Sequence, residues 1–381
     1  MNKKRHLHII SQENASIGEV TKDIIEGLKN NFIITEESLN EIPEKYDILL
    51  CHYVSPAVTQ HECFKDFRHK VLIFPVDGTK FIQPYIDSFN SFDLIVTPAN
   101  AGKDILKQNG VTTKIIVIPN FWKPEHLVEP RFLKQRSLDK EIKGKFVFYY
   151  EANYYPRKGY RELLINYIKE FSSNIYKNEV VLLLKTDNSL ITYNYFEDLK
   201  DEIFEIQKEY KYPAKVVKVS QNIEFEELKK IWNKIDCYVH PARIEGFGIP
   251  LLRMAVLNKP IIVLENELSG YNDYLSSYPL THFVKSNKVI AENEQNKAYS
   301  KDSEWSLMNY VDFRNTLRIV YLNYRNNQVR VRCKARILKN STNYLYINVI
   351  KQYVELFNSL NNNNLFIEIK NENSWSKIHL S

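Results

Sequence analysis

Residues 240–266 read HPARIEGFGIPLLRMAVLNKPIIVLEN, and this stretch decides how the rest of the chain is interpreted. Its beginning is typical of the end of a buried strand, and its middle has the apolar pattern of a helix. Between them stand a carboxylate, Glu245, and two glycines, Gly246 and Gly248, in a chain with only 10 glycines among 381 residues. Because Pro250 suits the first turn of a helix, we expect the helix to begin just after Gly248.

This turn has the features of an anion site. Gly246 and Gly248 would leave the backbone bare near a helix N-terminus, where unpaired N–H groups and the helix dipole attract phosphate. Glu245 is placed to accept hydrogen bonds from ligand hydroxyls, so a sugar joined to a diphosphate would satisfy both groups. A lone Gly-x-Gly is a weak signal, and a plain strand-to-helix turn with a solvated Glu245 is the alternative.

Length, composition and charge favour a globular protein of two domains and argue against a nucleic-acid-binding protein. A chain of 381 residues exceeds what one hydrophobic core supports, so two domains are expected. The 44% apolar residues, with 20 Phe and 25 Tyr, indicate a globular chain. The net charge of +6 suits an anionic small molecule or an acidic membrane surface. No dense basic stripe or nucleic-acid motif is present, so nucleic acid is not an expected partner.

Targeting signals are lacking in the sequence. The four cysteines have neither zinc-site spacing nor the density of a disulfide scaffold, which favours a reducing compartment. The N-terminal apolar segment is too short for a signal peptide, and no run of eighteen apolar residues occurs. We therefore expect a cytoplasmic protein.

Short apolar runs alternate with helical patterns along the chain, which predicts an α/β fold with parallel sheets buried on both faces. Strand-like runs occur at residues 7–10, 46–52, 70–76, 92–98, 114–120, 145–153, 179–186, 214–220, 236–242 and 259–265. Residues 121–144 carry prolines and charges and no strand pattern, which suits a connection between two doubly wound units. The predicted domains are residues 1–124 and 125–344, and a C-terminal helix at about 345–381 is expected to pack back on the first.

Residues 245–265 resemble the signature of retaining GT-B glycosyltransferases of glycosyltransferase family 4, in which a Glu-Gly-Phe-Gly turn leads into a helix and a strand. Residues 92–111, 114–124 and 156–171 resemble further segments of that family, in the expected order. The resemblance implies two Rossmann-like domains facing a cleft. The second domain would hold a nucleotide sugar and the first would hold the acceptor.

The resemblance also implies roles for single residues. The expected catalytic residues are Glu245 on the donor-sugar hydroxyls, Lys158 on the diphosphate leaving group, and the first-domain His52 facing the donor. A cation at Lys158 has a physical reason, since it would neutralise charge that develops on the departing diphosphate. Gly18 is expected in the turn after the first strand, in a loop that approaches the phosphates. Lys185 and Asn222 follow strands of the second domain and would border the nucleotide base. The remaining donor-side residues are Arg157, Gly246, Phe247, Gly248, Ile249 and Arg253. Acceptor contacts are expected at Asp77 and Lys80.

Two positions depart from the family pattern. Asn153 stands where the family often has an arginine, and Arg157 is expected to substitute from another angle. Arg253 stands where the family has a second glutamate that holds the ribose hydroxyls. A guanidinium only donates hydrogen bonds, so Arg253 would bind phosphate or ribose oxygens, or pair with Glu245. An unusual donor, a ribose held by another residue, or lost catalysis would each explain it.

The sequence thus predicts a retaining glycosyltransferase that moves a sugar from a nucleoside-diphosphate sugar to an acceptor hydroxyl, in bacterial surface glycan or glycoconjugate synthesis. The acceptor would be a glycan, a lipid-linked glycan or a protein, and the enzyme would contact the inner face of the cell membrane. No metal or cofactor is expected, because Asp-x-Asp motifs and His/Cys clusters are lacking. The alternatives are a catalytically inactive sugar-nucleotide or glycan-binding subunit of another glycosyltransferase, and a GT-B epimerase or phosphorylase.

Overall fold

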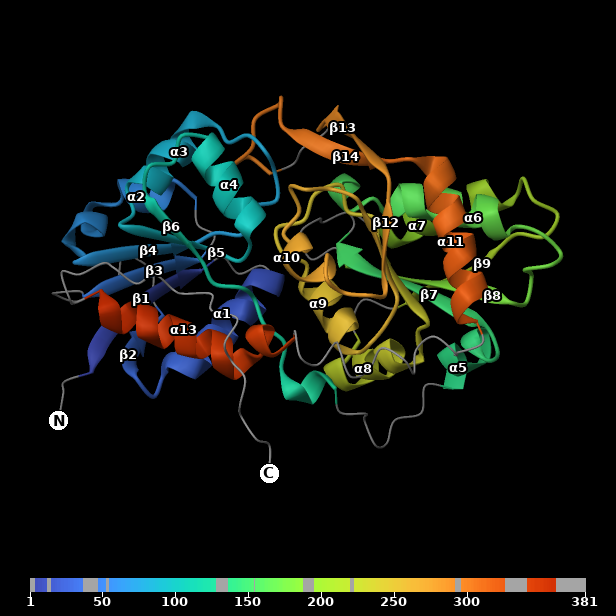
Figure 1. Ribbon diagram of the computed structural model, residues 1–381, viewed down its shortest axis with the longest axis horizontal. Helices are drawn as coiled ribbons and strands as arrows, with labels where there is room; N and C mark the ends of the chain where they lie inside the picture. Colours follow the sequence, from blue (N-terminus) through green and yellow to red (C-terminus); the bar gives the residue numbers. More distant parts are fainter. Residues whose placement is uncertain are drawn as a thin grey trace.

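The protein folds into two lobes that lie side by side, each built around one sheet (Figure 1). The computed structural model describes residues 4–11, 15–36, 47–52, 55–127, 136–153, 155–187, 195–219, 223–291, 296–325 and 341–360. None of the helices in these residues has the length and apolar character that a bilayer-spanning helix requires.

The first lobe contains a six-stranded parallel sheet with the order β2-β1-β3-β4-β5-β6. Its strands are β1 (Arg5–Ser11), β2 (Phe32–Thr35), β3 (Ile48–His52), β4 (His69–Ile73), β5 (Leu94–Thr97) and β6 (Lys114–Val117). Its helices are α1 (Ala15–Leu28), α2 (Ala57–Gln60), α3 (Gln83–Asn90) and α4 (Asn100–Gln108), with a 3-10 turn, η2 (Glu62–Asp66). The strands β3 and β5 are buried along their whole length because helices cover both faces, as their continuous apolar runs predict.

The second lobe contains another six-stranded parallel sheet, ordered β12-β11-β10-β7-β8-β9. Its strands are β7 (Phe146–Asn153), β8 (Val180–Asp187), β9 (Lys215–Val219), β10 (Cys237–His240), β11 (Ile261–Leu264) and β12 (Thr281–Val284). Its helices are α5 (Arg136–Ile142), α6 (Tyr160–Phe171), α7 (Tyr195–Gln207), α8 (Phe225–Lys234), α9 (Ile249–Val256), α10 (Asn272–Leu275) and α11 (Tyr310–Tyr324). The prediction of two doubly wound parallel sheets is therefore confirmed.

The strand orders identify where each sheet can bind a ligand. The chain changes direction across the sheet between β1 and β3 in the first lobe, and between β7 and β10 in the second. In open α/β sheets, ligands bind outside the carboxyl ends of the strands at such a point. Residues that follow β7 and β10 are therefore the natural site residues of the second lobe.

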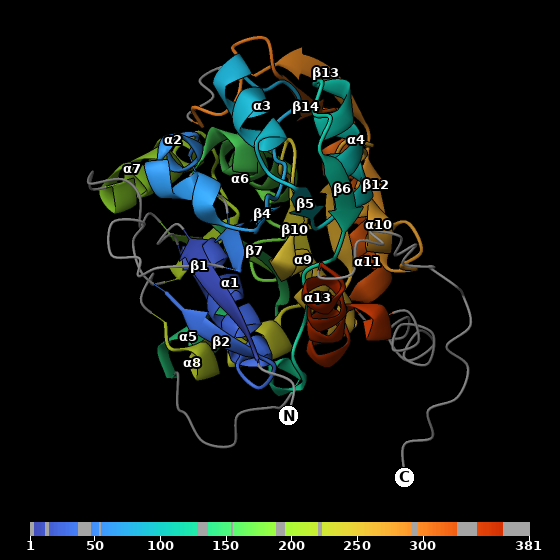
Figure 2. The same ribbon diagram turned by 90° about the vertical axis from the view of Figure 1, so that its left-hand side faces the viewer.

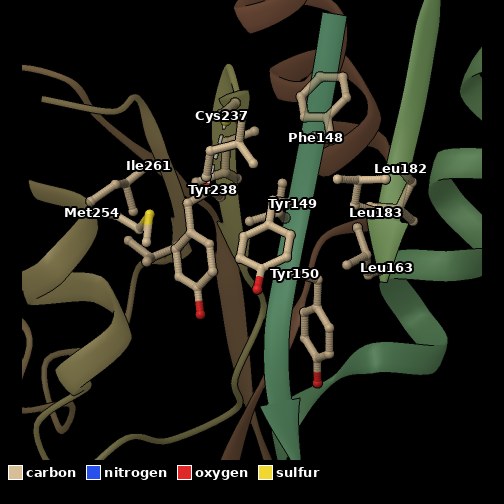
Figure 3. Close-up of a cluster of buried hydrophobic side chains, with 14 of the residues drawn as sticks. Phe148, Tyr149, Tyr150, Leu163, Leu182, Leu183, Cys237, Tyr238, Met254 and Ile261 are labelled. Carbon is tan, nitrogen blue, oxygen red and sulfur yellow. Dashed lines mark hydrogen bonds between the residues drawn. The ribbon is translucent and has the colours of Figure 1, made fainter. Parts of the chain in front are cut away.

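Three buried tyrosines in the core of the second lobe have their hydroxyl groups on the side of this sheet edge. Figure 3 shows the buried side chains of Tyr149, Tyr150 and Tyr238 with their hydroxyl groups pointing toward the carboxyl end of β7. All three residues are fully buried. The apolar core thus ends in a layer of hydroxyl groups beneath the site.

The chain returns to the first lobe near its C-terminal end. Helix α13 (Tyr346–Ser359) packs against α1, and a Cβ on Gly27 would lie 2.6 Å from the side chain of Ile350. The two segments that cross between the lobes are joined by hydrogen bonds from Trp122 N to Tyr344 O (2.9 Å) and from Tyr346 N to Trp122 O (3.0 Å). Helix α13 lies under the first sheet, red beside blue in Figure 1.

A hairpin from the second half of the sequence also reaches the first lobe. Strands β13 (Ser286–Ile290) and β14 (Glu304–Met308) pair in antiparallel fashion, and both views show them at the same end of the molecule as α3 and α4 (Figures 1 and 2). We call the connecting residues 296–303 the strap. The strap residue Tyr299 packs on Phe81, with ring centroids 4.8 Å apart, and both belong to a core cluster of the first lobe. Residues within the 125–344 range therefore contribute to the core of the first lobe.

Candidate functional site

Lys158 and Glu245 are brought together by two loops at the switch point of the second sheet. Lys158 ends a short 3-10 turn, η4 (Pro156–Lys158), which follows β7, and Glu245 follows β10. Between η4 and α6, Gly159 has a left-handed φ of 66°, and a Cβ there would lie 2.3 Å from Pro241 O. A glycine is needed at this point because the two loops are in backbone contact.

The two side chains form a buried ion pair. The Nζ atom of Lys158 lies 2.5 Å from Oε2 of Glu245, and the side chains are 14% and 12% exposed. The same carboxylate oxygen lies 3.1 Å from Nε2 of His240, the last residue of β10. These contacts place one carboxylate, one ammonium and one imidazole in a single cluster.

The charges of this cluster can be assigned. Burial would raise the pKa of the Glu245 carboxyl, but the ammonium of Lys158, the hydrogen bond from His240 and the guanidinium of Arg157 outweigh it and hold that pKa well below its usual range. Burial lowers the pKa of His240, so its neutral ring donates the Nε2–H to Glu245. Burial and Arg157 lower the pKa of Lys158, while Glu245 and Asp77 oppose them. At neutral pH, Glu245 is therefore a carboxylate.

The N-terminus of α9 lies next to this ion pair. Gly248 precedes α9 with a left-handed φ of 83°, and the hydroxyl of Tyr274 donates to the carbonyl oxygens of Phe247 and Gly248, both at 2.8 Å. Within the described part of the chain, no acceptor contacts the amides of Gly248, Ile249 and Leu251. Such amides, with the positive end of the helix dipole, can bind an anion.

Gly246 was expected to expose its backbone to a phosphate, but it instead allows close packing between the two lobes. A Cβ on Gly246 would lie 3.0 Å from Val76 O, so this glycine allows the first lobe to approach the turn. On the other side, a Cβ on Gly270 would lie 2.0 Å from Gly246 O. Gly246 is enclosed by protein, and only Gly248 stands at the helix N-terminus.

Arg157 and Asp77, expected on the donor and on the acceptor, are paired with each other. The Nη2 atom of Arg157 lies 2.6 Å from Oδ2 of Asp77, and its Nη1 donates to the carbonyl oxygen of Ile244 at 2.9 Å. Lys80, the other expected acceptor contact, is half exposed and pairs with Asp302 at 2.5 Å. The structure therefore does not bring Lys80 and Asp77 into one site.

Arg253 does not pair with Glu245, so that interpretation of the sequence is wrong. Its guanidinium lies 5.4 Å from the ring centroid of Trp232, and Nη2 lies 3.7 Å from Oε2 of Glu19 in the first lobe. The Nε atom of Arg253 is buried without a hydrogen-bond partner among the described residues.

A second buried carboxylate, Glu151, lies near the end of β7 and was not predicted from the sequence. Its Oε2 accepts hydrogen bonds from the hydroxyl of Tyr149 (2.9 Å) and from Nε1 of Trp232 (3.0 Å), and its Oε1 lies 3.8 Å from Nζ of Lys185. Lys185, expected near the nucleotide base, is thus the neighbour of Glu151 across β7 and β8. The position of Glu151 at the carboxyl end of a central strand was the signal that could have found it.

Close polar contacts connect the two carboxylate clusters. The hydroxyl of Tyr238 donates to the backbone oxygen of Glu151 at 2.8 Å and lies 3.3 Å from Nδ1 of His240, whose other nitrogen contacts Glu245. Polar groups at the ends of β7 and β10 therefore lie in one layer.

His52 stands at the end of β3, the switch point of the first sheet. Its Nδ1 lies 2.7 Å from the hydroxyl of Thr21, and that hydroxyl donates to Ile17 O at 2.8 Å, so Nδ1 carries the proton of His52. Burial lowers the pKa of His52 to about 3 and keeps the ring neutral. Gly18 lies in α1, not in the expected turn, and a Cβ on it would meet open space. Asn222 lies outside the described residues.

Comparisons with known proteins support the glycosyltransferase-like fold. Residues 69–119 match the family model described as "Glucosyltransferase 3-like, N-terminal domain". A comparison with curated protein sequences finds no match. Among the described residues, no group of three or more His, Cys, Asp or Glu side chains could hold a metal ion.

Several solved structures share the fold at low sequence identity. A glycosyltransferase from Rickettsia africae ESF-5 has a TM-score of 0.66 and 12% identity, over 95% of this chain and 100% of that one. A UDP-forming trehalose-phosphate synthase from Burkholderia xenovorans has a TM-score of 0.66 and 10% identity, over 94% and 98%. A trehalose-6-phosphate enzyme from E. coli, bound with UDP-2-fluoro glucose, has a TM-score of 0.66 and 11% identity, over 93% and 99%. The chain therefore has the GT-B fold, and its first lobe includes a segment similar to the N-terminal domain of glucosyltransferase 3-like proteins.

Proposed function

We propose that this protein is a retaining glycosyltransferase, similar to those of family 4, that transfers a sugar from a nucleoside-diphosphate sugar to an acceptor hydroxyl. One observation carries the proposal. The buried Lys158–Glu245 pair lies beside the N-terminus of α9, at the switch point of a sheet with the GT-B arrangement. A cation and helix amides suit a diphosphate, and a carboxylate suits sugar hydroxyls.

The proposed donor binding rearranges the charges at the site. Lys158 and Arg157 carry two positive charges, and Glu245 and Asp77 carry two negative charges, so the cluster of two ion pairs is neutral. In our proposal the diphosphate takes Lys158 from Glu245 and contacts the amides of Gly248 and Ile249. The sugar hydroxyls then donate to the released carboxylate, and the ion pair is replaced without an unpaired buried charge.

In the proposed reaction, the bond between the anomeric carbon and the diphosphate oxygen breaks. The acceptor oxygen bonds to the same face of the sugar, and the proton of the acceptor hydroxyl passes to the departing diphosphate oxygen. Lys158 and the amides at α9 stabilise the charge that develops on the departing diphosphate. Glu245 orients the sugar and does not attack it. His52, neutral at the end of β3, has an unprotonated Nε2 that can accept a hydrogen bond from the sugar or the acceptor. No metal or cofactor takes part in this scheme.

We propose bacterial surface glycans or glycoconjugates as the biological context, with a glycan, a lipid-linked glycan or a protein as the acceptor. The net charge of +6 suits weak attachment of a cytoplasmic enzyme to the anionic inner face of the cell membrane. UDP-sugars are the first donors to test, because the E. coli protein of similar fold was bound with a UDP-sugar analogue.

Donor hydrolysis and transfer, measured with a panel of nucleoside-diphosphate sugars, test this proposal. Wild type should release nucleoside diphosphate from at least one donor, and Lys158→Met and Glu245→Gln should each reduce kcat at least about 100-fold. Lys29→Met, which removes an exposed ion pair in the first lobe, serves as the control. Release that is equal in wild type and Lys158→Met would refute the proposal.

A second candidate function is a sugar-nucleotide-binding subunit without catalysis, which Arg253 favours because it replaces the family's second glutamate. This candidate predicts calorimetric binding of a nucleoside diphosphate without turnover of any donor. An epimerase or phosphorylase would instead form free sugar or sugar phosphate without an acceptor, so product analysis separates the three.

A further inference from the structure

The contact between Arg157 and the first lobe has a consequence for the site of the second lobe. Arg157 directly precedes Lys158, and its Nη1 donates to the carbonyl oxygen of Ile244, directly before Glu245. The backbone oxygen of Arg157 also accepts a hydrogen bond from Arg243 N at 2.8 Å. A single residue thus ties together the two turns that carry the buried ion pair.

The other end of this guanidinium is held by the first lobe. The carboxylate of Asp77 contacts Nη2 of Arg157 at 2.6 Å, and the two side chains are 21% and 16% exposed. Asp77 follows β4, so an element of the first lobe reaches the Lys158 turn. Because the pair is mostly shielded from water, its geometry is better defined than that of a surface pair.

Asp77 is itself oriented by the strap. The hydroxyl of Tyr299 donates to Oδ1 of Asp77 at 3.0 Å and accepts a hydrogen bond from Asp77 N at 2.9 Å. The tyrosine ring lies where a Cβ on Gly78 would be, 2.5 Å away, so Gly78 is required for this approach. Backbone hydrogen bonds from Ile82 N to Ala298 O and from Ser300 N to Lys80 O, at 3.0 and 2.8 Å, fix the strap on the first lobe.

We propose that Asp77 and Tyr299 are positioning residues: they hold the Arg157 guanidinium, and Arg157 in turn fixes the turns that carry Lys158 and Glu245. This inference rests on the proposed function. It also replaces the expected role of Asp77 as an acceptor contact. The contacts form one line, from the strap through the first lobe to the ion pair.

Asp77 and Arg157 also act on Lys158 electrostatically. Among the described residues, the charged and titratable groups around Lys158 include Glu245, Arg157, Asp77 and His240, and the hydroxyl of Tyr150 lies 3.4 Å from the backbone oxygen of Lys158. Arg157 lowers the pKa of Lys158, whereas Asp77 raises it. If the Lys158 ammonium is required for turnover, Asp77→Asn should move the basic limb of the kcat/KM profile to lower pH. Arg157→Gln should move it to higher pH, which a purely structural role would not produce.

Three full-length variants test the proposal: Asp77→Asn, Tyr299→Phe, and the control Asp302→Asn, which removes the exposed strap pair with Lys80. Hydrogen exchange followed by mass spectrometry should show faster exchange in residues 155–159 and 243–248 for the first two variants, with strand β8 unchanged. Their kcat should fall at least about tenfold, with donor KM within about threefold, because a small displacement of catalytic groups is costly.

The proposal is overturned if Tyr299→Phe and Asp77→Asn exchange in both turns as the control does. It is also overturned if exchange rises while kcat stays within about twofold of wild type. Should wild type transfer sugar from no donor, the proposed function fails, and the exchange comparison still decides whether the two residues hold the turns.

Discussion

Replacing Lys158 by Met should destabilise the second lobe strongly, because it leaves the Glu245 carboxylate buried beside only a neutral imidazole and the more distant Arg157. The Met side chain has a similar length and no charge, so packing is largely kept. The double variant Lys158→Met/Glu245→Gln removes both charges and leaves an amide that can still accept the Nε2–H of His240.

The magnitude follows from the geometry of the pair. At 2.5 Å and an effective dielectric constant of about 20, the attraction between the two charges is about 332/(20 × 2.5), or ~7 kcal/mol. The cost of removing the ammonium from water cancels part of this, and the loss of one partner from a buried pair costs about 3–5 kcal/mol in measured cases. We therefore expect Lys158→Met to lower the free energy of unfolding by about 3 kcal/mol. The double variant should stay within about 1.5 kcal/mol of wild type.

Native-state hydrogen exchange of β7 and β10 is the suitable assay, since it reports the free energy of opening locally and does not require the two lobes to unfold together. The cycle comprises wild type, both single variants and the double variant, with Lys29→Met as the exposed-pair control. The reasoning is refuted if Lys158→Met costs less than about 1 kcal/mol, or if the single effects add up in the double variant.

Three further outcomes are expected. Gly159→Ala should lower the free energy of unfolding by at least about 2 kcal/mol, because its Cβ would lie 2.3 Å from the carbonyl oxygen of Pro241. The control Gly144→Ala has a similar φ of 73° but open space around the Cβ, and it should cost about 1 kcal/mol; urea unfolding measures both variants. Burial lowers the pKa of His52 from 6.5 to about 3, so between these pH values the unfolded state binds one proton more than the folded state, and the free energy of unfolding falls as the pH falls. His52→Asn should reduce the slope of the free energy of unfolding against pH by up to about 1.4 kcal/mol per pH unit, measured by urea unfolding at pH 4–6. Arg253→Ala loses the stack on Trp232 and should weaken nucleoside-diphosphate binding less than about tenfold by calorimetry, whereas a loss of a hundredfold would mean that the guanidinium contacts the nucleotide.

The fold could be predicted from the sequence because its signals are local. Each of the ten strand-like runs lies on a strand, since a parallel strand covered on both faces must be apolar along its length. The short strands β2, β12, β13 and β14 were missed. Strand β2 has three successive apolar residues, but it begins only four residues after the end of α1, so it is easily read as part of that helical pattern. In β12, β13 and β14, polar residues interrupt the apolar ones, so no continuous apolar run marks these strands.

The closeness of Lys158 and Glu245 could also be anticipated, because both follow strands of one parallel sheet and the carboxyl ends of such strands share an edge. Their direct pairing was not anticipated. The sequence assigned each of them to a different part of a ligand, whereas the structure pairs the two charges with each other, since a buried charge requires a partner.

Contacts between distant segments could not be predicted. Asp77 and Tyr299 are 222 residues apart, and no local pattern indicates that the strap crosses to the first lobe. The role of Gly246 could not be predicted either, because a side chain at this position is excluded by the backbone of Val76, which belongs to the other lobe. The stack of Arg253 on Trp232 likewise depends on how α8 packs beside α9.

A crystal structure with uridine diphosphate bound would test most directly whether the α9 turn and Lys158 grip the leaving group of a sugar donor. We predict that the diphosphate lies within hydrogen-bonding distance of Nζ of Lys158 and of the amides of Gly248 and Ile249, and that Lys158 has moved away from Glu245. A diphosphate bound elsewhere, with the 2.5 Å contact between Lys158 and Glu245 intact, would contradict the account.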